Sequence, residues 1–220
     1  MLNIDSNGMI ANSRIKLKRF MTLERDEFDG RLQGVHAIIV HQTDTLIAPF
    51  GSYSQKNANG SHFVIDKDGT IYQTASLYHQ VDHVGLIQAR CLEKHACTDV
   101  DKLAFEQMKL GRRSKKRPNQ AEYKAIHLWE KFKPYPVRFP ANLDSIGIEI
   151  VSKAYNPDGS LPVTDSYRAI FEPVNDVQNQ SLRWLVGELK QTLGRPTIEI
   201  LPHPRAGRKN PDEASSAKWR

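Results

Sequence analysis

The sequence has few of the features that mark an exported or membrane-bound chain. Its longest apolar runs, AIIV at 37–40 and SIGIEIV at 145–151, are far shorter than the roughly 20 residues that a transmembrane helix needs. The first thirty residues carry charges throughout and contain no apolar stretch that could form the core of a signal peptide. We therefore expect no transmembrane segment and no conventional export signal.

Cysteine is also scarce, since Cys91 and Cys97 are the two cysteines of the 220 residues. Their short separation permits one local disulfide in an oxidising compartment, and two reduced thiols fit the sequence equally well. His95 lies between them, but a zinc knuckle would need a fourth ligand at a standard spacing, which is missing. This cluster is therefore not interpreted as a metal site.

Internal repeats and low-complexity segments are absent, and 39% of the residues are hydrophobic. A chain of this length and composition can bury one core. We expect a single domain over 1–220, with an N-terminal extension at 1–33 and a charged, partly helical insertion at 86–140.

The net charge of +6 and the pI of about 9.3 favour contact with polyanions without choosing among them. The densest basic run lacks the interleaved aromatic residues of a single-strand nucleic-acid groove. We interpret it as a solvated loop and expect no nucleic-acid partner, although salt-sensitive attachment to an anionic envelope stays open. The residues of this run are Arg112, Arg113, Lys115, Lys116 and Arg117.

Hydrophobic patterns predict strands separated by helices. Strands are expected at 35–40, at 61–66 and 70–75 as a hairpin around Gly69, at 145–151 and at 196–201. In the strand SIGIEIV, alternation places the isoleucines on one face and Glu149 on the other. Leucine spacing predicts a helix from Asn179 to Leu193 that ends at Gly194. The fold class is therefore mixed α/β, a mixed sheet covered by helices.

Chemically useful side chains follow or lie within three of these strands. His41 ends the first strand, Glu149 lies within the SIGIEIV strand, and His203 comes directly after the last. Two histidines and a carboxylate form a common catalytic zinc set with a fourth position open for water. A lone histidine in an apolar strand is more often a hydrogen-bonded core residue, so the pattern alone is a weak signal, and His36 faces away from His41 in a regular strand.

Five segments resemble, in their sequences and in their order along the chain, those of the type 2 N-acetylmuramoyl-L-alanine amidases. This superfamily includes phage amidases and animal peptidoglycan recognition proteins. The matching pieces are IIVHQT, SHFVIDKDGTIYQ, DHVG, NLDSIGIEIV and HPRAGRKNPDEASSAKW. The resemblance leaves out the N-terminal thirty or so residues and the insertion. It implies an amidase-like fold.

The resemblance implies that His41 and His203 bind Zn²⁺ together with an acidic residue after Lys209. The family has an aspartate or cysteine two residues beyond this lysine, where the present sequence has Pro211. Counting ten positions from His203, as in the aspartate form, arrives at Glu213, which is the favoured third ligand. The alternative is the neighbouring Asp212.

The resemblance also implies roles for the surrounding residues. Glu149 matches the glutamate that handles protons, work typically worth about 10²–10⁴-fold in rate, and Lys209 matches the lysine that stabilises the oxyanion. His83, Asn142 and His62 are predicted to contact substrate, with a turn role as the alternative for Asn142 and a structural role as the alternative for His62.

The implied function is zinc-dependent hydrolysis of the amide bond between N-acetylmuramic acid and L-alanine in peptidoglycan. The alternative is a peptidoglycan-binding module without catalysis. Because no export signal is visible, the expected route from the cytoplasm to the cell wall is a dedicated secretion machine or lysis. Between these routes we favour secretion, and we expect the protein to be an antibacterial effector with a cognate immunity protein as a partner.

Overall fold

The computed structural model describes the chain except for residues 26–30, 33, 109–119 and 195–196. The basic run at 112–117 lies outside the described residues. The helices and strands, in chain order, are β1 Ile15–Leu17, the 3₁₀ helix η1 Met21–Leu23, β2 Glu24–Arg25, β3 Ala37–Gln42, α1 Phe50–Tyr53, β4 Phe63–Ile65, β5 Ile71–Gln73, β6 Gln80–Val81, α2 Arg90–Glu93, α3 Asp99–Gln107, α4 Gln120–Glu130, the 3₁₀ helix η3 Asn142–Asp144, β7 Ser145–Ile150, β8 Ala154–Tyr155, β9 Ile170–Phe171, α5 Asp176–Thr192, β10 Glu199–Pro202 and α6 His203–Ala206.

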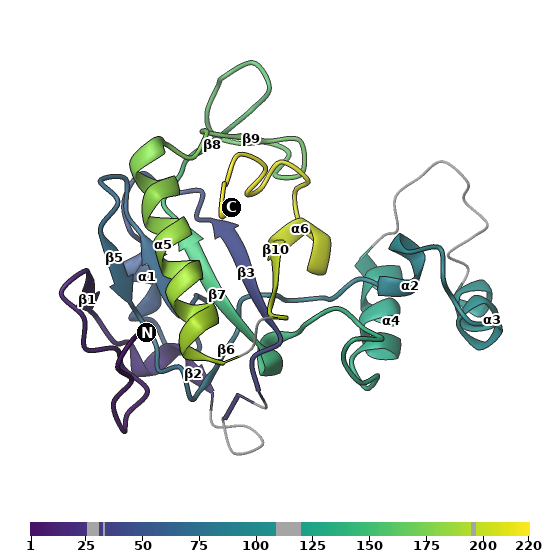
Figure 1. Cartoon of the computed structure of the whole chain (residues 1–220). Coiled ribbons are helices and arrows are strands. Elements are labelled where there is room, and N and C mark those ends of the chain that lie inside the picture. Colours follow the sequence, from purple (N-terminus) through teal and green to yellow (C-terminus); the bar gives the residue numbers. More distant parts are fainter. Residues whose placement is uncertain (26–30, 33, 109–119, 195–196) are drawn as a thin grey trace.

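A six-stranded sheet in the order β1-β5-β4-β7-β3-β10 forms the centre of the molecule (Figure 1). Three neighbouring pairs are parallel, namely β4 with β7, β7 with β3, and β3 with β10. Strand β5 runs antiparallel to β4. The predicted mixed sheet and the hairpin at Gly69, whose φ is 80°, are both confirmed. Parallel strands end at the same edge, so the residues at the ends of β3, β7 and β10 meet there.

Helix α5 covers one face of the sheet, as Figure 1 shows from the front. Its leucines pack on the isoleucines of β7 and the alternate residues of β3 in the main hydrophobic core. The helix begins at Asp176, three residues before the predicted start, because the side chain of Asn175 accepts a hydrogen bond from the backbone of Gln178. Gly194, at a φ of 63°, follows the helix as predicted.

The opposite face of the sheet carries the chemically useful residues. Ala37, Ile39 and Leu201 form a second core cluster there. The register pairs His41 with Glu149 across β3 and β7, so these two side chains project from the same face. The predicted alternation in β7 is confirmed, because its isoleucines are buried against α5 while Glu149 is turned away from them.

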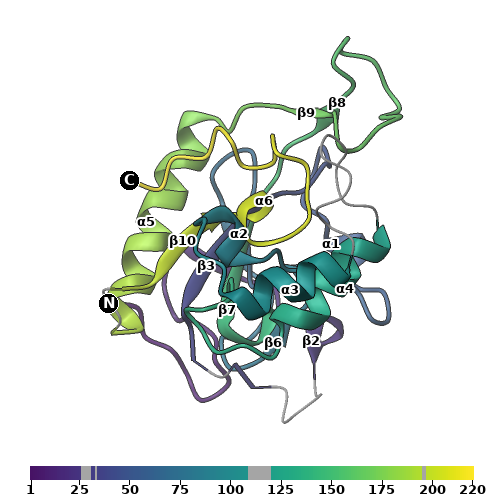
Figure 2. The same cartoon turned by 90° about the vertical axis from the view of Figure 1, so that its right-hand side faces the viewer.

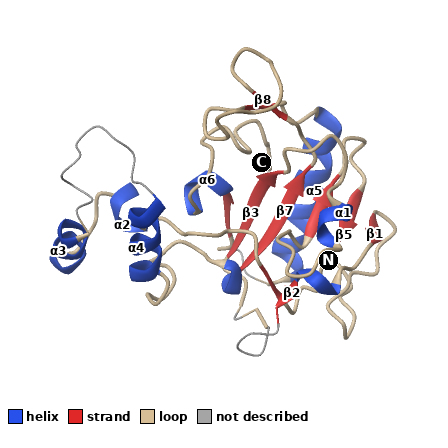
Figure 3. Ribbon diagram, turned by 180° about the vertical axis from the view of Figure 1, so that it is seen from behind, coloured by secondary structure: helices blue, strands red, loops and turns tan. Residues whose placement is uncertain are grey.

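The N-terminal segment belongs structurally to the sheet. Strand β1 pairs in parallel with β5 and forms one edge, and β2 pairs with β6 at the bottom of the molecule in Figure 1. Seen from behind, the short helix α1 lies over the sheet on the face opposite α5 (Figure 3). Residues before the matching segments therefore complete the sheet.

Helices α2, α3 and α4 project from the β10 side of the sheet as a separate group, which Figure 2 views face on. Their small core contains Ala89, Phe105 and Ile126, and Cys91 and Cys97 form a disulfide beside it. The question left open by the sequence is thus answered in favour of a disulfide. No helix in the described part of the chain is long and apolar enough to cross a membrane.

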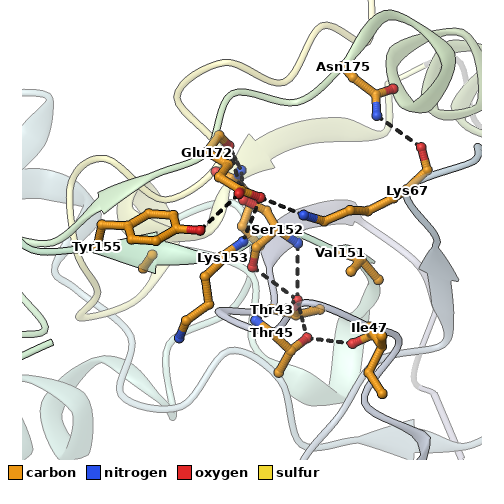
Figure 4. A network of polar contacts seen from close by, with 12 residues as sticks. Thr43, Thr45, Ile47, Lys67, Val151, Ser152, Lys153, Tyr155, Glu172 and Asn175 are labelled. Carbon is orange, nitrogen blue, oxygen red and sulfur yellow. Dashed lines mark hydrogen bonds and ion pairs between the residues drawn. The ribbon is translucent and has the colours of Figure 1, made fainter. Parts of the chain in front are cut away.

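A polar network fixes the loops beyond the ends of β3 and β7 (Figure 4). The backbone N–H of Ser152 donates to Oγ1 of Thr43 at 3.2 Å. The carboxylate of Glu172 accepts hydrogen bonds from Nζ of Lys67 at 2.7 Å and from the hydroxyl of Tyr155 at 3.1 Å. These contacts hold the segment from β8 to β9 beside the sheet edge, where it forms a wall of the site.

Candidate active site

A cavity of about 760 Å³ opens at the sheet edge where β3, β7 and β10 end. One wall comes from the segment between β8 and β9, and another from the loop after β6 together with Gln120 at the start of α4. Most residues selected from the sequence line this cavity, namely His41, His83, Asn142, Glu149, His203, Lys209 and Glu213.

Three of these residues form a buried cluster suited to a metal ion. One ligand atom from each of His41, His203 and Glu213 lies within 4.8 Å of the other two. The two histidine Nδ1 atoms are 2.6 Å apart. Oε1 of Glu213 lies 2.9 Å from Nδ1 of His203 and 3.5 Å from Nδ1 of His41. All three residues are almost fully buried.

The hydrogen bonds behind the cluster turn both Nδ1 lone pairs toward one point. Nε2 of His203 lies 2.9 Å from the carbonyl oxygen of Val84, an acceptor, so Nε2 carries the proton. Nε2 of His41 lies 3.0 Å from Nδ1 of His83, whose own Nε2 faces the carbonyl of Ser145. With His83 protonated on Nε2, its Nδ1 accepts the proton of His41. Such partners fix the tautomer of metal-binding histidines.

The electrostatic state of the cluster also fits a cation. Burial lowers the pKa of His41 to about 3, which keeps the imidazole neutral and able to bind metal. Burial alone would raise the pKa of Glu213, but the neighbouring His203 and His41 rings hold it below its usual value. Two lone pairs and a carboxylate aimed at one point repel one another unless a cation lies between them. The residues therefore fit the Zn²⁺ that the sequence predicts.

Asp212, the alternative third ligand, is directed elsewhere. Its Oδ2 accepts a hydrogen bond from the backbone N–H of Phe171 at 2.8 Å, and its Oδ1 accepts one from Oγ of Ser215. The carboxylate thereby ties the C-terminal loop to β9. Ala214, next to Glu213, donates its backbone N–H to Gln42 at 2.7 Å, which brings Glu213 over the end of β3.

Glu149 is partly buried and shares the cavity with the cluster. Burial raises the pKa of its carboxyl group to about 7, while a hydrogen bond from the Tyr53 hydroxyl and the positive charge of Lys209 oppose this rise. Lys209 is exposed at the cavity wall. A carboxyl group with a pKa near 7 suits proton transfer at neutral pH.

Tyr53 is a site residue that sequence reasoning missed. It lies in α1 and is 2% exposed, and its hydroxyl donates to Oε2 of Glu149. The hydroxyl is also 3.4 Å from Oγ of Ser61. No motif in the sequence signals this contact, because α1 reaches β7 through tertiary packing alone.

Asn142 and His83 line the cavity, but both also support its framework. Oδ1 of Asn142 accepts the backbone N–H groups of His83 and Val84, at 3.1 and 2.8 Å. A Cβ atom on Gly147 would lie 2.9 Å from the His83 ring, so only glycine leaves room for this ring against β7. His83 is 8% exposed and touches His41, which makes it a support for a histidine of the buried cluster.

His62, predicted to contact substrate, does not line the cavity. It is fully buried, its Nδ1 accepts the backbone N–H of Gly147 at 3.1 Å, and its Nε2 lies 3.0 Å from the carbonyl of His79. Both ring nitrogens are thus used by the backbone. The structural alternative for His62 matches this position.

We expect His83→Ala to weaken metal binding about 10- to 100-fold, because removing a partner that orients a ligand typically has this effect. Metal affinity can be measured by competition with a chromophoric chelator. His95→Gln, at an exposed histidine far from the cluster in sequence, is the control and should bind metal like the parent chain. An unchanged affinity in His83→Ala, with a raised KM for substrate, would instead assign His83 to substrate contact.

The family model described as N-acetylmuramoyl-L-alanine amidase matches residues 31–215. No curated protein matches the sequence. The fold is similar to a crystal structure of a selenomethionine derivative of AmpD, with a TM-score of 0.52, 14% identity, and 96% of this chain and 93% of that chain covered.

Two further solved structures are similar with lower scores. One is the N-acetylmuramoyl-L-alanine amidase LysC from Clostridium intestinale URNW, with a TM-score of 0.44, 13% identity, and 92% of this chain and 91% of that chain covered. The other is AmpDh3 from Pseudomonas aeruginosa in complex with an anhydromuramic pentapeptide, with a TM-score of 0.44, 18% identity, and 95% of this chain and 60% of that chain covered.

The family match spans most of the chain, from before β3 to the residues just after Glu213. It includes both histidines and the glutamate of the buried cluster. The mixed α/β sheet agrees with the AmpD fold. The chain is a member of the N-acetylmuramoyl-L-alanine amidase family.

Proposed function

We propose that this protein hydrolyses the amide bond between the lactyl group of N-acetylmuramic acid and L-alanine in peptidoglycan, with Zn²⁺ as cofactor. The observation that carries the proposal is the buried set of His41, His203 and Glu213, which shares one cavity with Glu149 and Lys209. A zinc ion held by this set would polarise the scissile carbonyl and lower the pKa of a water molecule at the same place.

The remaining chemistry falls to side chains of the cavity. Glu149 accepts a proton from the attacking water and returns it to the nitrogen of the departing L-alanine. The C–O bond forms first and gives a tetrahedral oxyanion, and the C–N bond then breaks, so one water is consumed and a free carboxyl group and a free amine are released. Tyr53 holds the Glu149 carboxylate in place, and Lys209 offers a positive charge to the oxyanion.

A peptidoglycan-binding module without catalysis is the other candidate within the family. The one sequence feature in its favour is the irregular third ligand, since Pro211 occupies the position where the family has an aspartate or cysteine. Glu213 reaches the two histidines in spite of this irregularity. A module that only binds has no need for a proton-transfer carboxylate and a cation beside a metal set, which favours the enzyme.

We also propose that the protein acts in an oxidising compartment that gives access to the cell wall. The Cys91–Cys97 disulfide supports this placement, because disulfides persist mainly in such compartments. Delivery by a secretion machine or by lysis, an antibacterial role and an immunity partner stay predictions of the sequence.

The test is to measure zinc content and the release of peptide from purified peptidoglycan in the same preparation. We expect about one zinc per chain, with cleavage lost on chelation and regained when zinc is added, as an open catalytic zinc site requires. His203→Ala should lose both metal and cleavage. Binding to peptidoglycan without zinc and without cleavage would overturn the proposal in favour of the binding module.

A further inference from the structure

Arg208 lies on the loop that joins two metal-binding residues, five positions after His203 and five before Glu213. Arg208 is one of the residues that line the cavity. Its backbone N–H donates to the carbonyl of Leu86 at 2.9 Å, and the preceding Gly207 forms a bridge with the next residue of that strand-like segment. The backbone of Arg208 is therefore held firmly beside the buried cluster.

The guanidinium group of Arg208 is held as well. It stacks on the ring of Tyr123 in α4, with Cζ 4.5 Å from the ring centroid. Tyr123 is itself buried, at 8% exposed, so it provides a fixed platform. Stacking occupies a face of the planar guanidinium and leaves its N–H edge available for hydrogen bonds. A helix of the insertion thus positions an arginine in the wall of the cavity.

Arg208 has no acidic partner in the described part of the chain, in contrast to three other arginines that are buried or half-buried. Arg25, Arg90 and Arg138 each form an ion pair with a carboxylate. Within the described part of the chain, the Arg208 guanidinium forms no ion pair and no hydrogen bond, and it stacks on the Tyr123 ring. The protein thus holds the group in place without satisfying its charge or its donors.

The carboxylates that line the cavity contact side chains other than Arg208, and for Glu149 and Glu213 these partners are Tyr53 and the two histidines. Asp82 pairs with Arg25 at 2.7 Å, and Asp44 pairs with Lys153 at 2.6 Å. Both acidic residues line the same cavity as Arg208. A positively charged group of this kind, on a wall of a substrate cavity, matches an anion of the substrate.

The chemistry of the substrate identifies that anion, and this step rests on the proposed function. The muramyl sugar carries hydroxyl and acetamido groups, which are neutral, and its lactyl carboxyl is consumed in the scissile amide. Free carboxylates belong to the peptide. We infer that Arg208 binds a carboxylate of the stem peptide, and so marks the peptide side of the cavity. Guanidinium groups bind carboxylates through two parallel hydrogen bonds.

The experiment compares two synthetic N-acetylmuramyl tripeptides, one with all its carboxylates free and one with all of them amidated. We expect the parent enzyme to prefer the free acid by about 10- to 100-fold in kcat/KM, the size of a hydrogen bond to a charged group. Arg208→Gln should lose this preference through a higher KM for the acid, with kcat nearly unchanged. Arg208→Lys should keep part of it, because the charge remains without the planar fork.

Arg205→Gln is the matched control, since Arg205 lies in α6, three residues before Arg208, but pairs with Glu93 and does not line the cavity. This variant should keep the parent preference. Equal cleavage of both peptides by the parent, or a preference retained in Arg208→Gln, would overturn the assignment of Arg208 alone. If the parent cleaved neither these peptides nor purified peptidoglycan, the proposed amidase function itself would be overturned.

Discussion

Glu149→Gln should lower kcat for peptidoglycan cleavage by about 10²–10⁴-fold while leaving zinc bound, since general acid–base groups typically contribute this much. The substitution keeps the size of the side chain, and its amide oxygen can still accept the hydrogen bond from Tyr53. The buried set of His41, His203 and Glu213 does not depend on Glu149 for its contacts. Chemistry should fail while the metal site stays intact.

The pH dependence offers a second readout of the same variant. Burial raises the pKa of Glu149 to about 7, and the ionised form that accepts a proton is lost as the pH falls through this pKa. A bound cation favours the ionised form and lowers the pKa. We therefore expect the acidic limb of kcat/KM in the parent enzyme at or below pH 7, and a profile without this limb in Glu149→Gln.

Glu188→Gln is a suitable control for Glu149→Gln, because Glu188 lies on α5, which covers the other face of the sheet. Its activity, zinc content and pH profile should equal those of the parent. A loss of less than tenfold in Glu149→Gln would remove Glu149 from proton transfer. Loss of zinc or of the folded state in that variant would assign it a structural role instead.

Glu213→Ala should weaken zinc binding by more than about 100-fold and abolish cleavage. Partners that merely orient a ligand change metal affinity by about 10- to 100-fold, and loss of a ligand has a larger effect. The Glu213 carboxylate lies within 3.5 Å of a ring nitrogen of both histidines. Zinc affinity measured by chelator competition, together with the cleavage rate, tests the expectation.

Asp212→Asn distinguishes the two adjacent carboxylates. Asp212 accepts the backbone N–H of Phe171, and an asparagine oxygen can accept the same hydrogen bond. Zinc affinity should therefore stay at the parent value, with a small loss of stability as the expected change. The opposite result, with zinc lost in Asp212→Asn and kept in Glu213→Ala, would show that the loop rearranges to present Asp212.

Sequence periodicity predicted the strands and helices in which buried and exposed side chains alternate regularly along the chain. The alternation in SIGIEIV placed Glu149 correctly because one face of β7 packs on α5. The helix start at Asp176 was missed by three residues because side-chain capping by Asn175, not hydrophobic spacing, sets it. The edge strand β1 was also missed, because a strand of three residues carries too little pattern to be distinguished from an extended tail.

The candidate site was predictable where its residues match the motifs of a known family, and unpredictable where contacts come from packing. His41, His203 and Glu213 were selected from the resemblance, with Glu213 placed by its position ten residues after His203, because two histidines and a carboxylate are a weak signal alone. The Tyr53 contact with Glu149 and the Arg208 contact with Tyr123 depend on how α1 and α4 lie against the sheet edge. Neither orientation is encoded in a short motif, so neither contact could be predicted from the sequence.

The metal cluster joins parts of the chain that are distant in sequence. His41 and His203 are separated by 162 positions, and Glu213 joins them only when the C-terminal segment has docked through Ala214 and Gln42. The unfolded chain offers no such set, so a metal ion that binds it binds the native state alone. By thermodynamic linkage, metal at a thousand times its Kd adds about 4 kcal/mol to the free energy of unfolding. A bound ion would thus also stabilise the docking of the C-terminal segment, which contains Glu213, against β3, which contains His41.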